Sequence, residues 1–434
     1  MKTLTAIIIG GGSRGTSYAT QMKKLGDKYR VVGIAEPAES RRENIEEMHN
    51  IPKENCYSSW KEILAQPKMA DVAVICTLDN MHYEPAMKAI ELGYDLLLEK
   101  PIAQTAQECV DIALAAEKKG GKVLVCHVLR YTPFYGKIKE LVMLGKIGDV
   151  MSVIQVEGVG NIHQSHSYVR GNWHSEKETT PMLLAKCCHD LDIIQWLIGK
   201  PCKNVQSFGS LTYFTSENAP EGAPVRCIDG TCPIKDTCVY NCMKLYYEDK
   251  NNGWFRGAAA GHIAKDSKPT DEEVLEALKT TDYGLCVFHA NNDVVDHQVV
   301  NMEFEGGATA NLTMNAFTMG LGGRYIRLFG TKGELYANMS DKEITLTVFD
   351  SNGPVKIPVA ETKEDITGGH GGGDIGIVRE LYEYINDEYE GYKAANIEIS
   401  AKNHLIGFAA EKARNNKSVE DVSSYMKELG IVNN

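Results

Sequence analysis

LTAIIIGGGSRG, residues 4–15, carries the clearest structural signal in this chain of 434 residues. Its first six residues are apolar enough for a buried strand. Gly10, Gly12 and Gly15 then follow the spacing G-x-G-x-x-G before a helix-like stretch begins at Thr16. In such a turn the first glycine permits the tight bend, the second lets the backbone approach a pyrophosphate, and the third lets helix and strand pack closely. Because free N–H groups at a helix start favour phosphate, the segment predicts a dinucleotide site.

An acid at the end of the next expected strand supports this interpretation. The apolar run from Val31 to Ala35 ends at Glu36, which lies twenty-one residues after Gly15. A carboxylate at this place accepts hydrogen bonds from the ribose hydroxyls of NAD and repels the 2′-phosphate of NADP. Arg41 follows closely and can soften that preference, although a solvated helix face is the simpler interpretation of its charge. We expect NAD, with NADP the lesser alternative.

Composition and charge exclude several classes of function. A chain of this length is expected to form two domains. Its formal net charge is −12 and no block of Lys and Arg stands out, which disfavours nucleic-acid binding. No apolar run approaches the roughly 18 residues of a membrane span, and the N-terminus enters a strand without a signal peptide. We therefore expect a cytoplasmic protein with no membrane partner.

The first 126 residues alternate between strand-like and helix-like segments. Apolar strands are expected at 4–9, 31–35, 70–76, 94–98 and 122–127. Repeated strand–helix–strand units predict an α/β fold, a Rossmann NAD-binding domain over residues 1–126. Ligands bind at the carboxyl ends of such parallel strands, which here are Thr77–His82, Glu99–Pro101 and His127–Tyr131.

The remaining residues, 127–434, have a different pattern. Strands joined by short turns between 298 and 349 predict an α+β domain for substrate binding and oligomerisation, built on a large open antiparallel sheet. One helix is expected over 182–197, and further helices close the chain within 374–434. Between about 214 and 284 we expect an irregular insertion that carries cysteines and has a single helical stretch, 271–279.

Four cysteines stand close together in this insertion. Cys227, Cys232, Cys238 and Cys242 fall within sixteen residues. Thiols at this density can surround a structural zinc ion or a small iron–sulfur cluster, although the spacing C-x4-C-x5-C-x3-C matches no standard zinc ribbon. A reduced cysteine-rich loop or a local disulfide is the alternative.

Four motifs follow the order of the Gfo/Idh/MocA oxidoreductases. They are GGGSRG at 10–15, TLDNMH at 77–82, EKP at 99–101 and HDLD at 189–192. The chain resembles a less characterised branch of that family, with a cysteine-rich insertion. The resemblance implies a Rossmann domain, a C-terminal domain on an open antiparallel sheet, NAD(P), and a sugar or cyclitol substrate. It also implies a homo-oligomer, a dimer or a tetramer, because that sheet often forms the subunit interface. Ala185, with Lys186 beside it, stands where the family often has an aspartate.

The expected cofactor contacts lie on the glycine turn and at the ends of the strands that follow. They are Gly10, Gly12, Ser13, Arg14, Gly15, Glu36, Arg41, Thr77, Leu78, Asn80, His82, Glu99 and Lys100.

Oxidising a secondary alcohol needs a hydride acceptor and a base for the hydroxyl proton. NAD supplies the first. Lys100, at the end of a strand where the nicotinamide should lie, is the leading candidate for the second. His189 is the second candidate, with Lys186 one turn earlier on the expected helix. An exposed Glu99–Lys100 pair and a packed core histidine are the alternative interpretations. Asp192 can orient His189 or form a salt bridge.

Substrate contacts are expected from a polar and aromatic set at the entry to the second domain, since sugars are often bound by aromatic stacking and hydrogen bonds. The set comprises Arg130, Tyr131, His163, His166, Tyr168, Arg170 and Trp173, with Asp192 from the helix. Ordinary packing between domains is the alternative.

Together these features predict an NAD-dependent oxidoreductase that transfers a hydride between the cofactor and a secondary hydroxyl of a sugar, cyclitol or glycoside. One alternative is a redox-neutral, glycosidase-like enzyme that acts through a transient 3-keto sugar. Another, of a different class, is a non-catalytic NAD-binding sensor or scaffold, which the missing aspartate keeps open.

Overall fold

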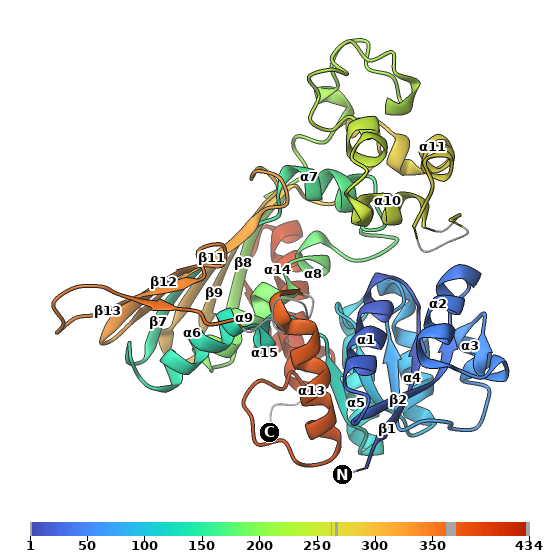
Figure 1. The fold of residues 1–434 in the computed structure, drawn as a ribbon. Coiled ribbons are helices and arrows are strands. Elements are labelled where there is room, and N and C mark those ends of the chain that lie inside the picture. Colours follow the sequence, from blue (N-terminus) through green and yellow to red (C-terminus); the bar gives the residue numbers. More distant parts are fainter. Residues whose placement is uncertain (1, 262, 265–267, 362–369, 431–434) are drawn as a thin grey trace.

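The computed structural model describes residues 2–261, 263–264, 268–361 and 370–430. Over these residues the chain forms two sheets with helices packed between them (Figure 1). A bilayer-spanning helix is absent from these ranges, because none of the helices combines the required length with sufficient hydrophobicity.

The first sheet has six parallel strands in the described chain, in the order β3-β2-β1-β4-β5-β6. The strands are β1 (Leu4–Ile9), β2 (Tyr29–Ala35), β3 (Cys56–Tyr57), β4 (Val72–Ile75), β5 (Asp95–Leu98) and β6 (Val123–Val125). The flanking helices are α1 (Ser13–Lys24), α2 (Glu39–His49), α3 (Trp60–Ile63), α4 (Tyr83–Glu91) and α5 (Ala106–Lys119). The predicted Rossmann fold is confirmed, and the short β3 is an addition to it.

Both faces of this sheet are covered because its central strands are apolar throughout. Every residue of β4 is buried, and Ile8 packs into one core cluster while Ile7 and Ile9 pack into the cluster on the opposite face. Two-sided burial of this kind is typical of parallel sheets. The carboxyl ends of β1, β4 and β5 therefore meet at one edge, and the insertion lies above that edge (Figure 1).

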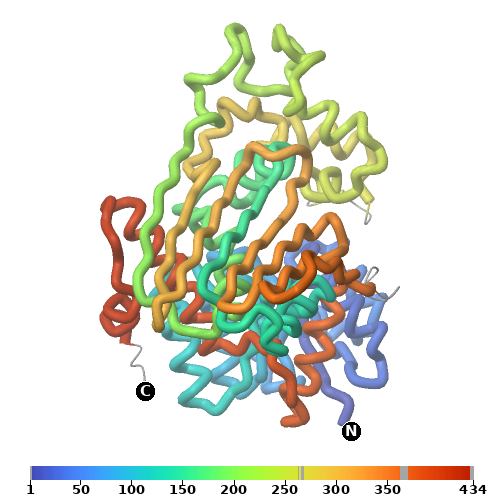
Figure 2. Tube along the Cα trace, turned by 90° about the vertical axis from the view of Figure 1, so that its left-hand side faces the viewer, coloured from blue at the N-terminus to red at the C-terminus, as the bar shows by residue number. Residues whose placement is uncertain are grey.

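The second sheet has nine strands among the described residues, in the order β14-β13-β12-β11-β7-β10-β9-β8-β15. They are β7 (Val150–Gly158), β8 (Cys202–Ser210), β9 (His297–Phe304), β10 (Thr309–Asn315), β11 (Gly323–Gly330), β12 (Gly333–Asn338), β13 (Glu343–Val348), β14 (Val355–Pro358) and β15 (Glu420–Asp421). Figure 2 shows these strands side by side across the molecule. The β7–β10 pair is parallel and the other pairs are antiparallel, so the sheet is mixed, unlike the expected antiparallel one.

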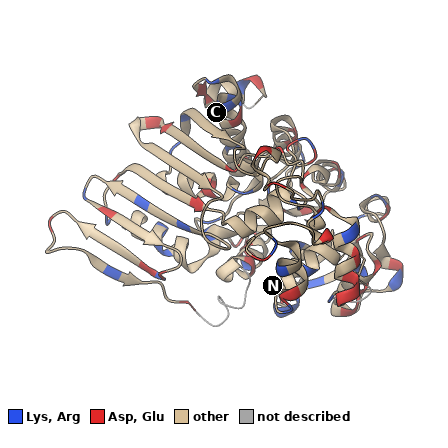
Figure 3. Cartoon of the chain, turned by 90° about the horizontal axis from the view of Figure 1, so that it is seen from above, with Lys and Arg blue, Asp and Glu red and all other residues tan. Residues whose placement is uncertain are grey.

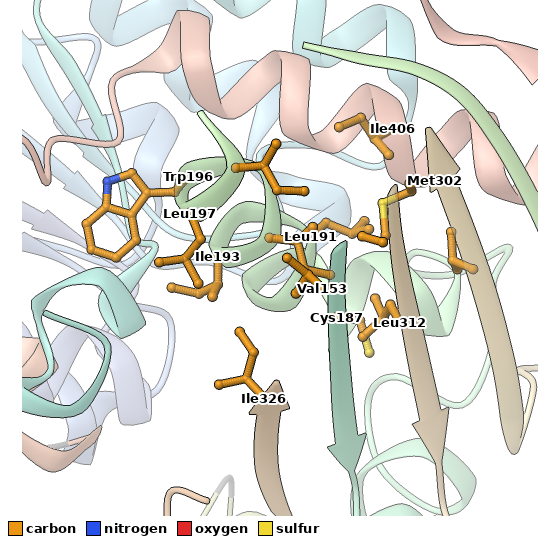
Figure 4. Packing of buried hydrophobic residues seen from close by; sticks show 14 of the residues in the cluster. Val153, Cys187, Leu191, Ile193, Trp196, Leu197, Met302, Leu312, Ile326 and Ile406 are labelled. Atoms are coloured by element: carbon orange, nitrogen blue, oxygen red, sulfur yellow. The ribbon is translucent and has the colours of Figure 1, made fainter. Parts of the chain in front are cut away.

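Helices cover one face of the second sheet. They are α6 (Pro133–Met143), α9 (Cys188–Ile198) and α14 (Ile397–Asn416), which meet in one large core cluster with the strands. Val153, Leu312 and Ile326 from three neighbouring strands lie against Leu191 and Ile193 of α9 (Figure 4). This packing fixes α9, which carries the HDLD motif.

The opposite face of the second sheet is open. Ile154 of β7 and Phe208 of β8 are 38% and 53% exposed on it. Lys, Arg, Asp and Glu are sparse along the strands in Figure 3.

The last helices return to the first domain. α13 (Gly373–Ile385) packs against α1, α14 packs against α5, and α15 (Val422–Glu428) follows beside β8. The C-terminal helices thereby tie the two sheets together.

The insertion between β8 and β9 is more ordered than expected. It contains α10 (Gly253–Ala260) as well as α11 (Asp271–Thr280), where only one helix was predicted. One small apolar cluster of buried residues lies within it, and a second is shared with Val169 and Ala316 outside the insertion. It packs on the segment after β7, where α7 (Asn161–His163) continues into a π-helical stretch, Gln164–Val169. α8 (Met182–Ala185) follows this segment.

Candidate active site

The glycine turn after β1 leaves space for a phosphate while α1 packs closely on it. Gly10 has φ +94°, and a Cβ there would lie 2.6 Å from the carbonyl oxygen of Cys76. A Cβ on Gly15 would lie only 1.9 Å from the Gly10 carbonyl oxygen. A Cβ on Gly12, by contrast, would have no described atom within 4 Å. Since α1 starts at Ser13, its first N–H groups are available there, and the turn fits the pyrophosphate of NAD.

Glu36 lies buried beside this turn at the end of β2. Its Oε2 accepts a hydrogen bond from the N–H of Gly11 at 2.6 Å, and its Oε1 accepts one from the N–H of Ala38 at 3.0 Å. Arg41 lies on α2, and its Nη2 would be 3.2 Å from a Cβ on Gly261. The insertion therefore approaches the first domain at the side where the adenosine of the cofactor is expected.

The loop from Thr77 to His82 is attached to the EKP turn through His82. The Nδ1 of this buried ring lies 2.7 Å from the carbonyl oxygen of Pro101, and its Nε2 lies 3.1 Å from the carbonyl oxygen of Thr77. Leu78 and Asn80 are exposed on the same loop. Among the predicted cofactor contacts on this loop, Leu78 and Asn80 are accessible, and His82 supports the turn from inside.

Arg14 and Glu99, both predicted cofactor contacts, bind each other. Arg14 Nε lies 2.6 Å from Glu99 Oε1, and Arg14 Nη2 lies 2.9 Å from Asp374 Oδ1 of α13. Tyr18 also donates to Glu99. Burial raises the pKa of Glu99, but the positive charges of Arg14 and Lys100 outweigh this effect. The pKa of Glu99 therefore lies below its ordinary value. The ionised Glu99 accepts the backbone N–H of Lys100 at 2.9 Å and so braces the turn that presents this lysine.

The helix predicted over 182–197 is broken at its middle. α8 ends at Ala185 and α9 begins three residues later. Because α8 ends there, the Ala185 carbonyl is a terminal group, and it accepts a hydrogen bond from Lys100 Nζ at 3.0 Å. Lys100, whose peptide bond to the following proline is cis, thus reaches from the end of β5 to the second domain. The expected regular turn between Lys186 and His189 is absent from this described segment.

His189 lies at the start of α9 with 8% of its surface exposed. Its Nδ1 has no hydrogen-bond partner among the described residues, and its ring packs edge-on to His127 with the centroids 5.9 Å apart. Burial, followed by Lys100 and His127, holds the pKa of His189 well below its ordinary value. The imidazole is therefore neutral, and its unpartnered Nδ1 is able to accept a hydrogen bond.

Lys186 belongs to a buried charge cluster that sequence reasoning missed. Its Nζ lies 3.4 Å from Glu157 Oε1, and the other oxygen of Glu157 lies 2.6 Å from Arg324 Nε. Arg324 also pairs with Asp190 at 3.0 Å. Burial lowers the pKa of Lys186, and Glu157 opposes that shift. The available signal was strand alternation, which places Glu157 on the same buried face of β7 as Val153.

Three of the predicted substrate residues lie beside these reactive groups. His163, Tyr168 and Trp173 follow one another with ring centroids 5.8 Å and 6.1 Å apart. Trp173 Nε1 donates to Asp79 Oδ2 at 3.0 Å, and Asp79 is a buried residue of the TLDNMH motif that the prediction omitted. Burial lowers the pKa of His163, and Lys186 adds to the effect, which places this ring near the lysine.

Arg130 and Asp192, both predicted to contact substrate, form a buried pair with each other. Arg130 Nε lies 2.7 Å from Asp192 Oδ2, and Arg130 Nη2 lies 2.6 Å from Asp192 Oδ1. Both side chains are at most 2% exposed, and Asn403 of α14 donates to the same carboxylate. Asp192 therefore holds the helices together through Arg130 and Asn403.

Arg170, Tyr131 and His166 are also directed elsewhere. Arg170 donates to the carbonyl oxygens of Leu285 and Tyr240 in the insertion. Tyr131 packs in a core cluster of the first domain. His166 lies 3.1 Å from the hydroxyl of Tyr246, also in the insertion. The contacts of these three residues agree with ordinary packing, the predicted alternative to substrate binding.

The cysteine group is not arranged as a metal centre. In the described ranges, no three His, Cys, Asp or Glu side chains are placed to hold a metal ion. Cys242 is buried in the insertion core, and its backbone N–H lies 3.4 Å from Cys227 Sγ. Cys227, Cys232 and Cys238 line a small cavity together with Cys286. The predicted structural zinc on Cys227, Cys232, Cys238 and Cys242 gains no support from this geometry, and the thiols are all free.

Comparison with known families agrees with the geometry. Residues 4–127 match the GFO_IDH_MocA description "Oxidoreductase family, NAD-binding Rossmann fold", and residues 139–396 match "Oxidoreductase family, C-terminal alpha/beta domain". The chain belongs to the Gfo/Idh/MocA oxidoreductase family. It is accordingly an oxidoreductase with an NAD-binding Rossmann domain.

Individual members of the family are distant. A putative oxidoreductase of Bacillus subtilis (strain 168), YteT, is 26% identical over 376 residues, which cover 83% of this chain and 84% of that protein. Inositol 2-dehydrogenase/D-chiro-inositol 3-dehydrogenase of Lactiplantibacillus plantarum is 23% identical over 203 residues, 46% of this chain and 54% of that protein.

Solved structures share the fold. Levoglucosan dehydrogenase in complex with NADH and L-sorbose has a TM-score of 0.70 at 17% identity, over 97% of this chain and 99% of that one. An oxidoreductase from Agrobacterium radiobacter in complex with NAD+, L-tartaric acid and magnesium has a TM-score of 0.68 at 12% identity, over 98% and 99%.

Proposed function

We propose that this Gfo/Idh/MocA protein transfers a hydride between NAD and a secondary hydroxyl of a sugar, cyclitol or glycoside. The observation that carries the proposal is the Lys100 amine. It is held at the carboxyl end of β5 by the 3.0 Å hydrogen bond to the Ala185 carbonyl, and it contributes to keeping the nearby His189 neutral. The inositol dehydrogenase relative and the levoglucosan dehydrogenase fold support the substrate class.

When bound, NAD supplies the hydride acceptor. The turn from Gly10 to Gly15 holds its pyrophosphate, and Glu36 binds the adenosine ribose and disfavours a 2′-phosphate. In its unprotonated form, the Lys100 amine takes the hydroxyl proton of the substrate. The neutral His189 accepts a hydrogen bond from the same hydroxyl and so orients it towards Lys100.

Turnover and cofactor binding together test the proposal. D-Glucose, D-galactose, D-xylose, myo-inositol and their methyl glycosides are incubated with NAD+, and NADH is followed by absorbance. Lys100→Met is expected to lower kcat by about 10²- to 10⁴-fold, the usual contribution of a positioned base. NAD+ affinity, measured by calorimetry, should stay within about twofold.

Two further variants complete this experiment. His189→Ala should lose turnover in the same way, whereas Lys88→Met, at an exposed ion pair with Glu91, should leave it unchanged. Full activity of Lys100→Met, or failure of the wild-type protein to oxidise any compound of the panel, would overturn the proposal.

We also propose that the open face of the second sheet forms the interface of a homo-oligomer. The apolar side chains Ile154 and Phe208 are exposed on it, and charged residues are sparse along the strands (Figure 3). Exposed apolar surface of this kind is typical of association sites.

A further inference from the structure

A row of aromatic rings connects the candidate active site with the insertion. We call Trp173, Tyr168, His163 and Trp254 the aromatic row. Successive ring centroids lie 6.1, 5.8 and 5.3 Å apart in that order. Its inner end is fixed by the hydrogen bond from Trp173 Nε1 to Asp79. Its outer end, Trp254, belongs to α10 of the insertion.

Trp254 differs from the other members of the row by its exposure. Tyr168 is 5% exposed, whereas Trp254 is 45% exposed. The Trp254 ring lies edge-on to His163 and to His166, whose centroid is 4.9 Å away. These neighbours hold the indole in place while leaving much of its surface open.

The aromatic row leads from this open ring to the loop that follows β4. Its inner member, Trp173, donates from Nε1 to Asp79 of the TLDNMH motif at 3.0 Å. The last turn of α10 approaches the first domain where Gly261 meets Arg41. α10 therefore lies on the side of the insertion that overhangs the carboxyl edge of the parallel sheet (Figure 1).

We propose that Trp254 forms a second subsite, distal to Lys100. The sugar ring that is oxidised lies at Lys100, and Trp254 binds the aglycone or second sugar attached to that ring. The inference rests on the proposed function and narrows its substrate class. Glycosides and oligosaccharides should be better substrates than free monosaccharides. A tryptophan that is fixed by neighbouring rings and 45% exposed offers a flat apolar surface, on which the C–H face of a second sugar or an aromatic aglycone can stack. Sites of this kind are lined by aromatic side chains, with a few polar groups that fix the orientation. Trp254 binds the substrate and takes no part in the chemistry.

The kinetics of Trp254→Ala test this subsite. The probes are D-glucose and D-galactose, compared with their 4-nitrophenyl glycosides and with cellobiose and lactose. For the wild-type protein, kcat/KM should be higher for the extended compounds. In Trp254→Ala, kcat/KM for the extended compounds should fall about five- to tenfold because one aromatic contact is lost. The fall should come from a higher KM, with kcat unchanged. The monosaccharide values should not move, and Trp254→Phe should retain most of the wild-type preference.

Phe349→Ala is the matched control, since Phe349 is an exposed aromatic residue next to β13 with 68% exposure. Equal losses for monosaccharides and glycosides in Trp254→Ala, or no loss at all, would overturn the subsite while leaving the proposed function intact. If the wild-type protein oxidises neither these probes nor any compound of the panel used to test the proposed function, the proposed function fails. Calorimetry on the NAD-loaded protein then decides the subsite: tighter binding of cellobiose than of glucose, lost in Trp254→Ala, supports it, and equal or undetectable binding overturns it.

Discussion

Lys100 depends on two neighbours that come from different parts of the chain. Glu99 accepts a hydrogen bond from the backbone N–H of Lys100, and the Ala185 carbonyl accepts one from Lys100 Nζ. The motif EKP indicated the lysine, but the helix break that frees the Ala185 carbonyl lies 85 residues further on. The position of the Lys100 amine therefore depends on tertiary structure and could not be predicted from the EKP motif alone.

The protonation state of His189 leads to the first prediction. Because burial, Lys100 and His127 keep its pKa well below the ordinary value of about 6.5, the ring stays neutral across neutral pH. We expect kcat/KM to show no titration near pH 6.5 that belongs to His189. The check is the pH profile of the wild-type protein, together with NMR of 15N-labelled histidine. A limb near that pH that disappears in His189→Asn would contradict the assignment.

The buried pair of Arg130 and Asp192 gives the second prediction. Arg130→Met leaves an unpaired buried carboxylate, so the free energy of unfolding should fall by about 3–5 kcal/mol. Burial raises the pKa of Asp192, but Arg130 and His127 lower it below its ordinary value. The stabilisation is therefore present above about pH 3.9, the unfolded pKa, and is lost as the pH falls through the folded pKa.

Urea unfolding of wild type and Arg130→Met at neutral and acidic pH measures this effect. The difference between the two proteins should shrink towards acidic pH, and KM of the folded variant should be unchanged. A raised KM with unchanged stability would restore Arg130 as a substrate contact.

Among the elements, the strand–turn–helix unit of β1 and α1 was predictable because its signal is local. The glycine spacing, the apolar strand and the acid after β2 all stand within 36 residues. The break between α8 and α9 was not predictable in this way. A continuous helical pattern over 182–197 is interrupted where Lys186 turns to Glu157 of β7, a contact that only the assembled sheet provides.

The turn itself gives the third prediction, in which two similar substitutions should act differently. Gly12→Ala places a methyl group in open space, so the unliganded protein should keep its Tm while NAD+ affinity falls, because that space is where the pyrophosphate is expected. Gly15→Ala forces a contact with the Gly10 carbonyl and should lower Tm as well. Differential scanning fluorimetry with and without NAD+ separates the two effects. Unchanged NAD+ affinity in Gly12→Ala would place the phosphates elsewhere.

Across the assembled molecule, the division into a parallel and a largely antiparallel sheet was predictable from the change in strand pattern. The parallel β7–β10 pair was not, because register between distant strands leaves no local trace. The insertion was recognised from its composition. Its order comes from two small apolar clusters, one of them shared with Val169 and Ala316, and was not predictable from its polar sequence.

The open sheet face gives the fourth prediction. Ile154→Glu combined with Phe208→Glu should convert a homo-oligomer into a folded monomer, because charged side chains would be buried without partners at the proposed interface. Size-exclusion chromatography with light scattering measures the mass. Leu114→Glu, at an exposed position of α5, is the control that should keep the assembly. An unchanged mass in the double variant would move the interface to another surface.

The central claim is that Lys100 faces the reacting carbon of a nicotinamide whose pyrophosphate lies on the turn from Gly10 to Gly15. A crystal structure of the complex with NAD+ tests it most directly. We predict the phosphates at the start of α1 and the nicotinamide ring next to Lys100 Nζ and His189. A Lys100 side chain directed to bulk solvent, or phosphates bound away from the turn, would contradict it.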